Sequence, residues 1–460
     1  MKVELPETIE ECHSLIKNLL AVIEKMQTEI DELKARLNQN SQNSNRPPSG
    51  DSFNKPKVAL PKKKRKKGGQ FGHLGKTLKR VAEPDVVFDC EPLDCDCGVR
   101  DWTNEGEIVE QRQVFELPEP RLEVIEYRRI KRICKCGKSG FGKFPEKVVA
   151  PVQYGERVQA MVALLSVHGC LSFGKIGQLF ADLYGYELNE ATSQTMVQRT
   201  SDRMPMEVIK AGVTASKVVN FDETGIKENG ELKWLHNAST DKLTYQFVHQ
   251  KRGKEAMTSE KSVLPKFLGI AVHDCWASYF GLSQMQHAVC NAHILRELTG
   301  VIENSESKWG EKMKELLLKM YETSDYGKGI IKEISGFEKK YNKILIEAEK
   351  EEPPPEKTNP RGKLKRTKGR NLLERLKKYK ESVLLFAKEK EVPFTNNQAE
   401  RDIRPTKVKQ KTSGGFRAES GTESYSRIHS FISTLRKLNR QVFQELLSVI
   451  AGNSFEIFQT

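Results

Sequence analysis

Apolar residues recur at alternating steps of three and four along the first forty positions. The series consists of Ile9, Cys12, Ile16, Leu19, Ile23, Met26, Ile30, Leu33 and Leu37. This spacing is a heptad repeat, and β-branched residues mostly at a with Leu or Met mostly at d favour a parallel pair of helices. We predict a coiled-coil oligomerisation helix over residues 1–40 and a homodimer held by Ile9, Ile16, Leu19, Ile23, Met26, Ile30 and Leu33. The alternative is an amphipathic helix that packs on its own domain.

A second pattern, short apolar segments separated by turn residues, runs from residue 217 to residue 289. It predicts a hairpin turn at Asn229-Gly230, a helix over residues 254–264, and strands at residues 217–221, 232–237, 243–249, 268–272 and 285–289. This element order is that of a ribonuclease-H-like α/β domain with a mixed five-stranded sheet. In that order the first and fourth strands are neighbours, so Asp222 and Asp274, each at a strand end, would converge.

The remaining segments differ in composition and predict separate parts of the chain. The parts are a polar and basic linker (41–77), a small β-rich module (78–150), a helical region with a helix-turn-helix-like break (151–216), a helical insertion rich in Lys and Glu (303–392) and a C-terminal helix (441–460). The catalytic domain then consists of residues 217–302 and 393–440. The helical region either sits on DNA or packs against the catalytic core.

Two closely spaced cysteine pairs, each followed by a glycine, stand in the β-rich module. They are Cys95, Cys97, Cys134 and Cys136. Four thiolates on two turns suit one tetrahedral Zn²⁺, and a module this small would gain folding free energy from the metal. A Cys-x-Cys spacing is tighter than the usual Cys-x-x-Cys. The alternative is four reduced cysteines in a compact hairpin.

The chain carries 76 Lys and Arg against 62 Asp and Glu, a formal net charge of +14. A polyanion is the natural partner of such a surface, because cations that neutralise phosphates release condensed counterions. Six consecutive cations form a solvated arm that would hold phosphates without reading sequence: Lys62, Lys63, Lys64, Arg65, Lys66 and Lys67. A merely solubilising tail is the alternative.

Neither a membrane segment nor a secretory signal is indicated by the sequence. No stretch of about 18 apolar residues exists, and the first residues lack a basic start followed by an apolar run. We expect a cytoplasmic protein with no membrane partner. Its nine cysteines are then thiols or metal ligands rather than disulfides.

Asp222 and Asp274 suit the chemistry of a divalent-metal site. Phosphodiester cleavage with two Mg²⁺ ions needs several carboxylates at one point, and Mg²⁺ prefers oxygen ligands. Asp222 would bridge both ions (Mg²⁺ or Mn²⁺), Asp274 would hold one, and a glutamate from a later helix would hold the other. One aspartate at a strand end is commonly a turn cap or a surface charge. Two at neighbouring strand ends favour a site.

The segment from residue 393 resembles the C-terminal signature of the insertion-sequence-66 family of DDE transposases. The signature Asn-Asn-x-x-Glu-Arg-x-x-Arg-Pro is matched by Asn396, Asn397, Glu400, Arg401, Arg404 and Pro405. The resemblance implies a bacterial, nucleoid-associated protein in which Glu400 is the third catalytic carboxylate, beside Asp222 and Asp274. Asn396-Asn397 is also a natural helix N-cap that would place Glu400 in the first turns. The neighbouring cations would hold the DNA backbone: Arg401, Arg404, Lys407 and Lys409.

Other segments resemble the same family. They are Asp222-Glu223-Thr224, Asp274 with Tyr279, Cys290 with His293 and Arg296, residues 43–49 and residues 68–73. The cysteine pairs depart from the family's usual spacing. His287, Cys290 and His293 also form a His-x-x-Cys-x-x-His series. Because a strand turns into a helix there, we predict that these side chains do not share one face and serve packing or DNA contact rather than a second zinc site.

The prediction is a DNA transposase that cleaves the ends of an insertion sequence and joins the 3′ hydroxyls to target DNA. Accessory proteins of the same element would be further partners. One alternative is a non-catalytic, zinc-containing DNA-binding regulator. The other is a ribonuclease-H-like nuclease without strand transfer, which would need neither the coiled coil nor the zinc module.

Overall fold

The computed structural model describes residues 8–44, 60–61, 77–91, 96–98, 107–355 and 366–457. The chain divides into two compact units. The larger consists of Met1–Lys62, Ala150–Gln178 and Leu188–Thr460, and the smaller of Lys63–Val149 and Leu179–Glu187. Among the helices of the described residues, none combines the length and the apolar character that crossing a membrane requires.

The larger unit contains a five-stranded sheet with the order β5-β4-β3-β6-β7. Its strands are β3 (Val218–Glu228), β4 (Glu231–Ser239), β5 (Thr244–His249), β6 (Ile270–His273) and β7 (Gln286–Val289). Antiparallel pairing joins β3 to β4 and β4 to β5, whereas β6 pairs parallel with both β3 and β7. The predicted mixed sheet is confirmed, and so is the adjacency of its first and fourth strands.

The β3–β4 hairpin turns where the sequence predicts it. Asn229 and Gly230 have φ values of +48° and +83°, which a two-residue type I′ turn requires. β3 continues to Glu228 instead of ending at residue 221, because its polar half pairs with β4 down to the turn.

The single helix predicted over residues 254–264 is wrong, because the structure has two short elements in its place. It is divided into α6 (Lys254–Met257) and the 3₁₀ turn η2 (Leu264–Lys266), because the polar residues 258–262 interrupt the apolar spacing.

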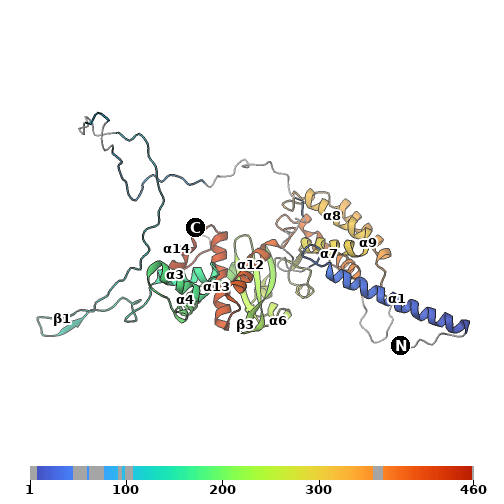
Figure 1. The fold of residues 1–460 in the computed structure, drawn as a ribbon, viewed down its shortest axis with the longest axis horizontal. Coiled ribbons are helices and arrows are strands. Elements are labelled where there is room, and N and C mark those ends of the chain that lie inside the picture. The colour runs from blue at the N-terminus through green and yellow to red at the C-terminus, as the bar shows by residue number, and fades with distance from the viewer. Residues whose placement is uncertain are drawn as a thin grey trace. The chain divides into compact units, whose positions relative to one another are not determined.

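Helices pack on the antiparallel half of this sheet. α12 (Asn397–Ser413) contacts β3 and β4, and α13 (Glu419–Lys437) contacts β5 (Figure 1). The flanking helices are α2 (Glu156–Val167), α4 (Glu190–Asp202), α5 (Met206–Thr214) and α14 (Val442–Ile450). α2 and α4 pack on α13, α5 on β5, and α14 on α2. Helix α3 (Phe173–Tyr184) has residues in both units.

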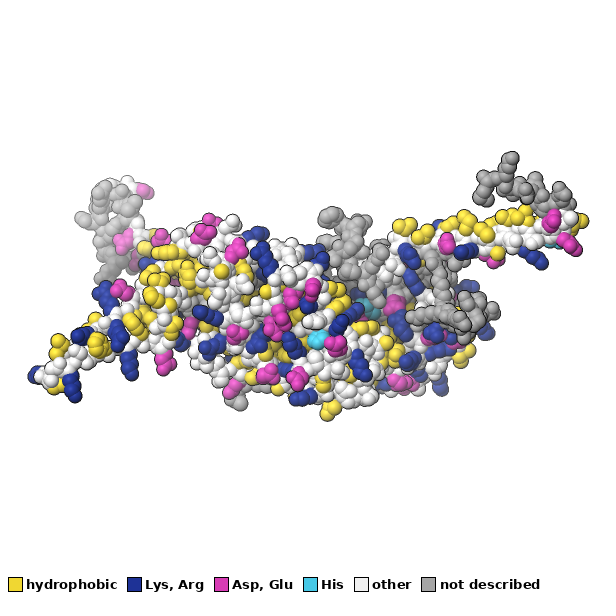
Figure 2. All heavy atoms as spheres, turned by 90° about the horizontal axis from the view of Figure 1, so that it is seen from below, with side chains coloured by type: hydrophobic (Ala, Val, Ile, Leu, Met, Phe, Trp, Pro, Cys, Tyr) yellow, Lys and Arg dark blue, Asp and Glu magenta, His cyan; other side chains and the backbone are white. Residues whose placement is uncertain are grey.

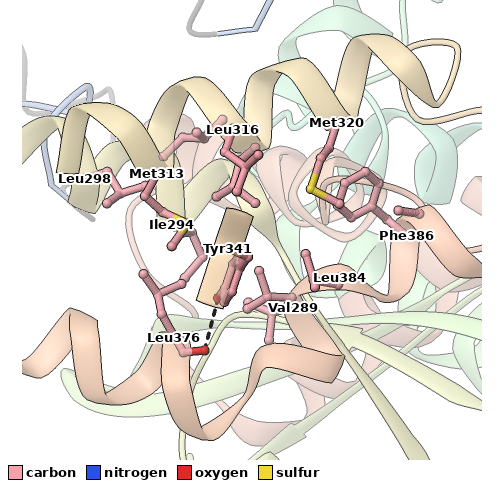
Figure 3. Close-up of a cluster of buried hydrophobic side chains, with 14 of the residues drawn as sticks. Val289, Ile294, Leu298, Met313, Leu316, Met320, Tyr341, Leu376, Leu384 and Phe386 are labelled. Atoms are coloured by element: carbon pink, nitrogen blue, oxygen red, sulfur yellow. Dashed lines mark hydrogen bonds between the residues drawn. The ribbon is translucent and has the colours of Figure 1, made fainter. Parts of the chain in front are cut away.

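A second apolar core lies in the chain between β7 and α12. It is formed by α7 (Asn291–Ser305), α8 (Lys308–Thr323), α9 (Ser335–Glu351), α10 (Lys368–Lys378) and α11 (Lys380–Lys388). Trp309 and Tyr341 are fully buried in it. The Tyr341 hydroxyl donates to the Leu376 carbonyl over 3.0 Å, which satisfies the one polar group of that side chain (Figure 3). The short 3₁₀ turn η3 (Tyr279–Gly281) precedes β7.

Helix α1 (Ile9–Leu37) confirms the predicted N-terminal helix. A capping box starts it: the Thr8 hydroxyl accepts from the Glu11 N–H, and the Thr8 N–H donates to the Glu11 carboxylate. The seven predicted interface residues are 42% to 77% exposed, and they form an apolar row along one side of the helix (Figure 2). The described part of the chain therefore leaves this face open.

The smaller unit contains the antiparallel pair β1 (Lys131–Ile133) and β2 (Ser139–Phe141). The alternating residues 121–133 predict a longer strand than this one. Residues 121–130 form no strand in the structure. An alternating segment needs a partner strand for its backbone hydrogen bonds, and the described part of this unit provides one only at β1 and β2.

Candidate functional site

Asp222 and Asp274 approach each other across the junction of β3 and β6. The parallel pairing matches Val218–Asn220 with Ile270–Val272, so Asp222 lies on β3 just beyond it. Asp274 directly follows the last residue of β6. Asp222 thus stands within β3, opposite Asn237 of β4, and not at a strand end as predicted. The parallel register nevertheless brings both carboxylates to the same edge.

Glu400 reaches this edge from the first turn of α12. The predicted N-cap position of Asn396 is confirmed, but its side chain makes no capping hydrogen bond to the helix. Instead the Asn396 Nδ2 donates to the Phe221 carbonyl over 2.6 Å, and its Oδ1 accepts from Asn220 Nδ2 over 2.9 Å. The start of α12 is therefore tied to the two residues that precede Asp222.

The electrostatics of Asp222 show that the three carboxylates share one environment. Burial raises its pKa well above the usual value for an aspartate. The negative charges of Asp274, Glu223 and, to a smaller extent, Glu400 raise this pKa further. The Glu223 N–H, which donates to Asp222 Oδ1 over 2.8 Å, acts in the opposite direction. Carboxylates that repel one another in this way favour the binding of a cation.

The donor atoms present fit a divalent ion. Asp274 Oδ1 and Glu400 Oε1 are both buried, and neither has a hydrogen-bond partner among the described residues. Leaving buried polar atoms unsatisfied is costly, and Mg²⁺ is bound in proteins through oxygen atoms of this kind. Asp222, Asp274 and Glu400 could therefore together hold a divalent ion.

A second buried carboxylate, Glu223, is neutralised by the protein itself. Its side chain is 3% exposed, and it accepts from the Tyr279 hydroxyl and, over 3.4 Å, from Arg252. The Arg252 guanidinium lies 4.4 Å from the Trp276 ring centre and 4.9 Å from that of Trp234. Burial raises the pKa of Glu223, whereas Tyr279 and Arg252 lower it. From the sequence, Glu223 is noted only because it follows Asp222 in the family motif, and no local pattern indicates that Arg252 belongs to the site.

The first turn of α7 adds two further side chains to Asp274. The ligand atoms of Asp274, Cys290 and His293 all lie within 4.8 Å of one another. The prediction that His287, Cys290 and His293 share no face is wrong for the latter two. It holds for His287, which contacts His273 and the Leu282 carbonyl. Position 290 caps α7 and position 293 lies one turn along, so a helical spacing of three brings them together.

The protonation of His293 follows from these neighbours. Burial alone would lower its pKa. The Cys290 sulfur and the Asp274 carboxylate outweigh burial and raise the pKa to about 10, while the Arg296 guanidinium opposes them. His293 Nδ1 lies 3.1 Å from Asp274 Oδ1, close enough for an ion pair but without hydrogen-bond geometry.

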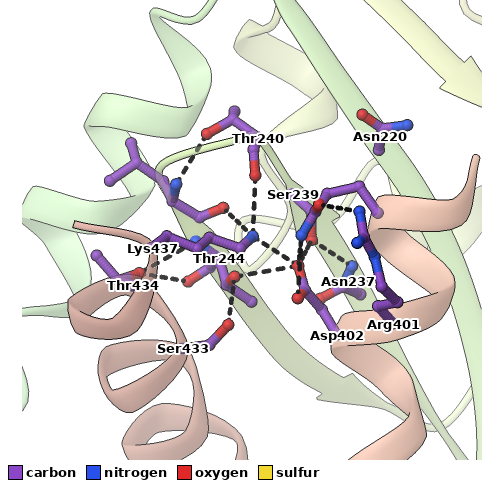
Figure 4. Close-up of polar contacts among 12 residues, drawn as sticks. Asn220, Asn237, Ser239, Thr240, Thr244, Arg401, Asp402, Ser433, Thr434 and Lys437 are labelled. Atoms are coloured by element: carbon purple, nitrogen blue, oxygen red, sulfur yellow. Dashed lines mark hydrogen bonds and ion pairs between the residues drawn. The ribbon is translucent and has the colours of Figure 1, made fainter. Parts of the chain in front are cut away.

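Two residues beyond Glu400, Asp402 anchors α12 to the sheet (Figure 4). Its carboxylate pairs with Lys437 of α13 over 2.6 Å. It also accepts hydrogen bonds from Ser239 over 2.6 Å and from Thr244 over 3.2 Å. This buried network joins α12, α13, β4 and β5, so the helix that carries Glu400 is fixed along its length as well as at its start.

The cations of α12 have two different environments. Arg401, Arg404 and Lys407 are exposed, although the Lys407 ammonium also donates to the Gly225 carbonyl and partial burial lowers its pKa. Lys409 is 8% exposed, and its ammonium donates to the Leu171 carbonyl over 2.7 Å. Burial lowers the pKa of Lys409 to about 8. The expected DNA contact of Lys409 is therefore corrected to a contact between helices, because the inward face of α12 carries this position. Lys62, Lys63, Lys64, Arg65, Lys66 and Lys67 lie outside the described residues.

The four cysteines predicted to bind zinc are only partly described. Cys95 lies outside the described residues, and Cys97 is exposed in a turn. Cys134 precedes the turn between β1 and β2 and Cys136 lies within it, where the Cys136 N–H lowers the pKa of the Cys134 thiol. Cys97, Cys134 and Cys136 do not form a compact ligand group of the kind found at Asp274.

Comparison with known families now identifies the chain. A family model described as Transposase IS66 family matches residues 151–424, more than half of the 460 residues. The chain belongs to the IS66 family of transposases. A family of unknown function matches residues 2–79 of this IS66 transposase. A search of curated proteins finds no match to it.

The matched span contains every residue of the candidate site. Asp222, Asp274 and Glu400 lie within residues 151–424, and so do Cys290 and His293. Membership of the IS66 family makes this chain a transposase, a nucleic-acid-modifying enzyme whose partner is DNA. The cysteines of the smaller unit and the run of cations lie outside the IS66 span.

Proposed function

We propose that this IS66 transposase cleaves the ends of an insertion sequence and joins the 3′ hydroxyls to target DNA, using Asp222, Asp274 and Glu400. The observation that supports this most is the convergence of three partly buried carboxylates that no cation of the described residues pairs with, apart from the His293 contact to Asp274. The order β5-β4-β3-β6-β7 supports a ribonuclease-H-like core.

The chain's own residues bind and orient the reacting groups in this proposal. Water cleaves a phosphodiester bond at the element end and releases a 3′ hydroxyl, which then attacks a phosphodiester bond of the target. Two Mg²⁺ or Mn²⁺ ions, when bound, activate the attacking oxygen and stabilise the leaving one. Asp222, Asp274 and Glu400 would together hold these ions. Because each attacking oxygen comes from water or DNA, no serine or tyrosine nucleophile is needed.

DNA is held beside the carboxylates by the exposed cations of α12. Arg401, Arg404 and Lys407 follow Glu400 on the same helix, which suits contacts to phosphates that position the duplex without reading its sequence. We assign a similar role to the cationic run from Lys62 to Lys67. A structural Zn²⁺ at Cys95, Cys97, Cys134 and Cys136 completes the proposal for the smaller unit.

A homodimer through α1 would bring two element ends together. The apolar row of α1 is exposed along the helix, and its heptad spacing suits a second copy of the same helix. Ile23→Glu, which places a charge in the centre of the row, is expected to give a monomer in light scattering. Lys25→Glu, a charge change off the row, is the matched control and keeps the wild-type mass. A wild-type monomer would contradict the proposed dimer.

The decisive test is cleavage and joining of DNA that carries the element's ends, with Mg²⁺, by wild type and Glu400→Gln. Loss of both steps in the variant, with DNA binding retained, supports the proposal. Glu419→Gln is a matched control, because Glu419 also lies in the first turn of a helix and is exposed. Wild-type binding without cleavage would favour a DNA-binding regulator. Cleavage without joining would favour a nuclease.

A further inference from the structure

Cys290, His293 and Arg296 form a strip along the start of α7. Cys290 is the N-cap residue, and the other two follow at steps of three. Residues three apart are neighbours on a helix surface, so the three side chains lie along one face. We call them the α7 strip. The proposed chemistry uses none of them. His293 nevertheless contacts Asp274, and Cys290 contacts Asn396 at the start of the helix that carries Glu400.

His293 is the contact of the α7 strip to Asp274. Its side chain is 12% exposed, and Nδ1 lies 3.1 Å from Asp274 Oδ1. On the other side of the ring, Arg296 Nη1 lies 3.4 Å from His293 Nε2. Arginine can only donate, so this contact favours a bare Nε2 and a proton on Nδ1. A doubly protonated ring also carries the Nδ1 proton. In both forms the Nδ1 proton is the ring proton nearest to Asp274 Oδ1, and the contact is electrostatic because the pair lacks hydrogen-bond geometry.

Cys290 is the contact of the α7 strip to α12. Its buried sulfur accepts the Asn396 N–H over 3.1 Å. Asn396 occupies the N-cap position of α12, and its side chain is bonded to Asn220 and Phe221, immediately before Asp222. One residue, Asn396, therefore connects Cys290 both to the helix of Glu400 and to the strand of Asp222.

These contacts oppose a strain that the site itself creates. The three carboxylates come from different elements, β3, the end of β6 and α12, and their charges repel one another. Without an ion, repulsion favours their separation. The α7 strip lies between Asp274 and Asn396 and is fixed by the rigid helix α7, whose apolar residues are part of the second core.

We propose that Cys290, His293 and Arg296 are positioning residues that hold Asp274 and the start of α12 in the arrangement that binds divalent ions. This inference rests on the proposed function of the three carboxylates. The α7 strip acts through Asp274 and Asn396 and not on the reacting atoms.

A soft metal bound by Asp274, Cys290 and His293 is the competing arrangement, since their ligand atoms lie within 4.8 Å of one another. The contacts favour the metal-free arrangement. Arg296 already places a cation beside the imidazole, and the N–H of a ring bound to metal through Nδ1 would face that donor. The competing arrangement predicts that the wild type contains bound zinc and that substitution of Cys290 or His293 removes it.

The test measures the affinity of the full-length chain for Mn²⁺. The electron paramagnetic resonance signal of free Mn²⁺ reports how much of the ion remains unbound. His293→Ala and Cys290→Ala are expected to raise the Kd for Mn²⁺ about tenfold or more, as losses of groups behind metal ligands do. His293→Asn, which keeps a polar N–H but not the charge of a protonated ring, is expected to give a Kd between those of wild type and His293→Ala. Cys275→Ser, next to Asp274 but outside the strip, is the matched control. A merely structural role would lower the melting temperature and leave the Kd unchanged.

Unchanged Mn²⁺ affinity in a folded His293→Ala would overturn the positioning role. If that variant does not fold, unchanged affinity in Cys290→Ala overturns it. Loss of one zinc per chain in either variant overturns it in favour of a soft-metal site. A wild type that binds no Mn²⁺ overturns both proposals. Suppose that the wild type binds Mn²⁺ and the variants change the Kd as expected, but the wild type neither cleaves nor joins end DNA. That result overturns the proposed function alone.

Discussion

Two carboxylates of α12, the buried Asp402 and the partly buried Glu400, stand two residues apart and have opposite surroundings. Asp402 is paired with Lys437 and accepts hydrogen bonds from Ser239 and Thr244. Glu400 Oε1 is buried without a partner among the described residues, and its charge contributes to the raised pKa of Asp222. The same helix therefore carries one carboxylate whose charge the protein balances and one whose charge it leaves unbalanced.

This difference distinguishes a buried carboxylate that stabilises the fold from carboxylates that serve the candidate site. A buried charge is tolerated when it is paired and hydrogen-bonded. Asp402 meets that condition within the chain, so its network fixes α12 against α13 and the sheet. Glu400, Asp222 and Asp274 would meet it only with bound cations. Neutralising Glu400 and neutralising Asp402 should therefore change different properties.

The largest expected effect is the loss of chemistry without loss of fold. Asp222→Asn, Asp274→Asn and Glu400→Gln should each lower the rate of end cleavage by roughly three orders of magnitude, about 4 kcal/mol of transition-state stabilisation. Their melting temperatures should stay at or above that of wild type in metal-free buffer, because each change removes a repelling charge. A variant with a clearly lower melting temperature but near-wild-type cleavage below that temperature would show that the carboxylate is structural.

The opposite result is expected at Asp402. Lys437→Met leaves a buried carboxylate unpaired and should lower the free energy of unfolding by about 3 kcal/mol, measured by denaturant titration. Lys411→Met, on the exposed side of α12, should change it by less than about 0.5 kcal/mol. Adding Asp402→Asn to Lys437→Met should recover part of the loss. If the two changes are simply additive, the ion pair contributes no coupling energy.

The pH dependence of stability sharpens the contrast. The pKa of Asp222 is raised in the folded chain, so the folded state holds that proton more tightly than the unfolded state does. The associated stability is complete at low pH and is lost as the pH rises from the ordinary carboxyl range through the raised pKa. In EDTA, Asp222→Asn should therefore lose less stability than wild type over this rise. Added Mg²⁺ should increase the stability of the wild type most at the high-pH end of this range, where the carboxylates are ionised. Parallel curves for the two proteins in EDTA would contradict the buried charge of Asp222.

The smallest effects concern the cations of α12. Arg404→Gln and Lys407→Gln should weaken DNA binding a few-fold and reduce the slope of log affinity against log salt by about one each. Lys409→Met should leave that slope unchanged, because its ammonium is bonded inside the protein. Titrations of DNA binding at several salt concentrations measure this, and an equal loss for Lys409→Met would place that side chain at the DNA.

Much of the candidate site was predictable because its residues sit on local signals. The five strands follow from alternation and turn residues, and Asn229-Gly230 marks the hairpin. Resemblance to the IS66 signature added Glu400, which periodicity alone does not distinguish from other helical glutamates. The predicted limits of the first strand are wrong, since β3 carries polar residues through the site and continues to Glu228.

By itself, the sequence determined the helix α1, the mixed sheet with neighbouring first and fourth strands, and the first-turn position of Glu400. These depend on spacing within a few residues, or on an element order that restricts the sheet to few arrangements. Only the tertiary structure decided that Lys409 faces inward, that Asn396 bonds β3 instead of capping its own helix, and that Cys290 and His293 meet Asp274. Each of these depends on groups distant in the chain, and the burial that brings them together has no trace in local periodicity.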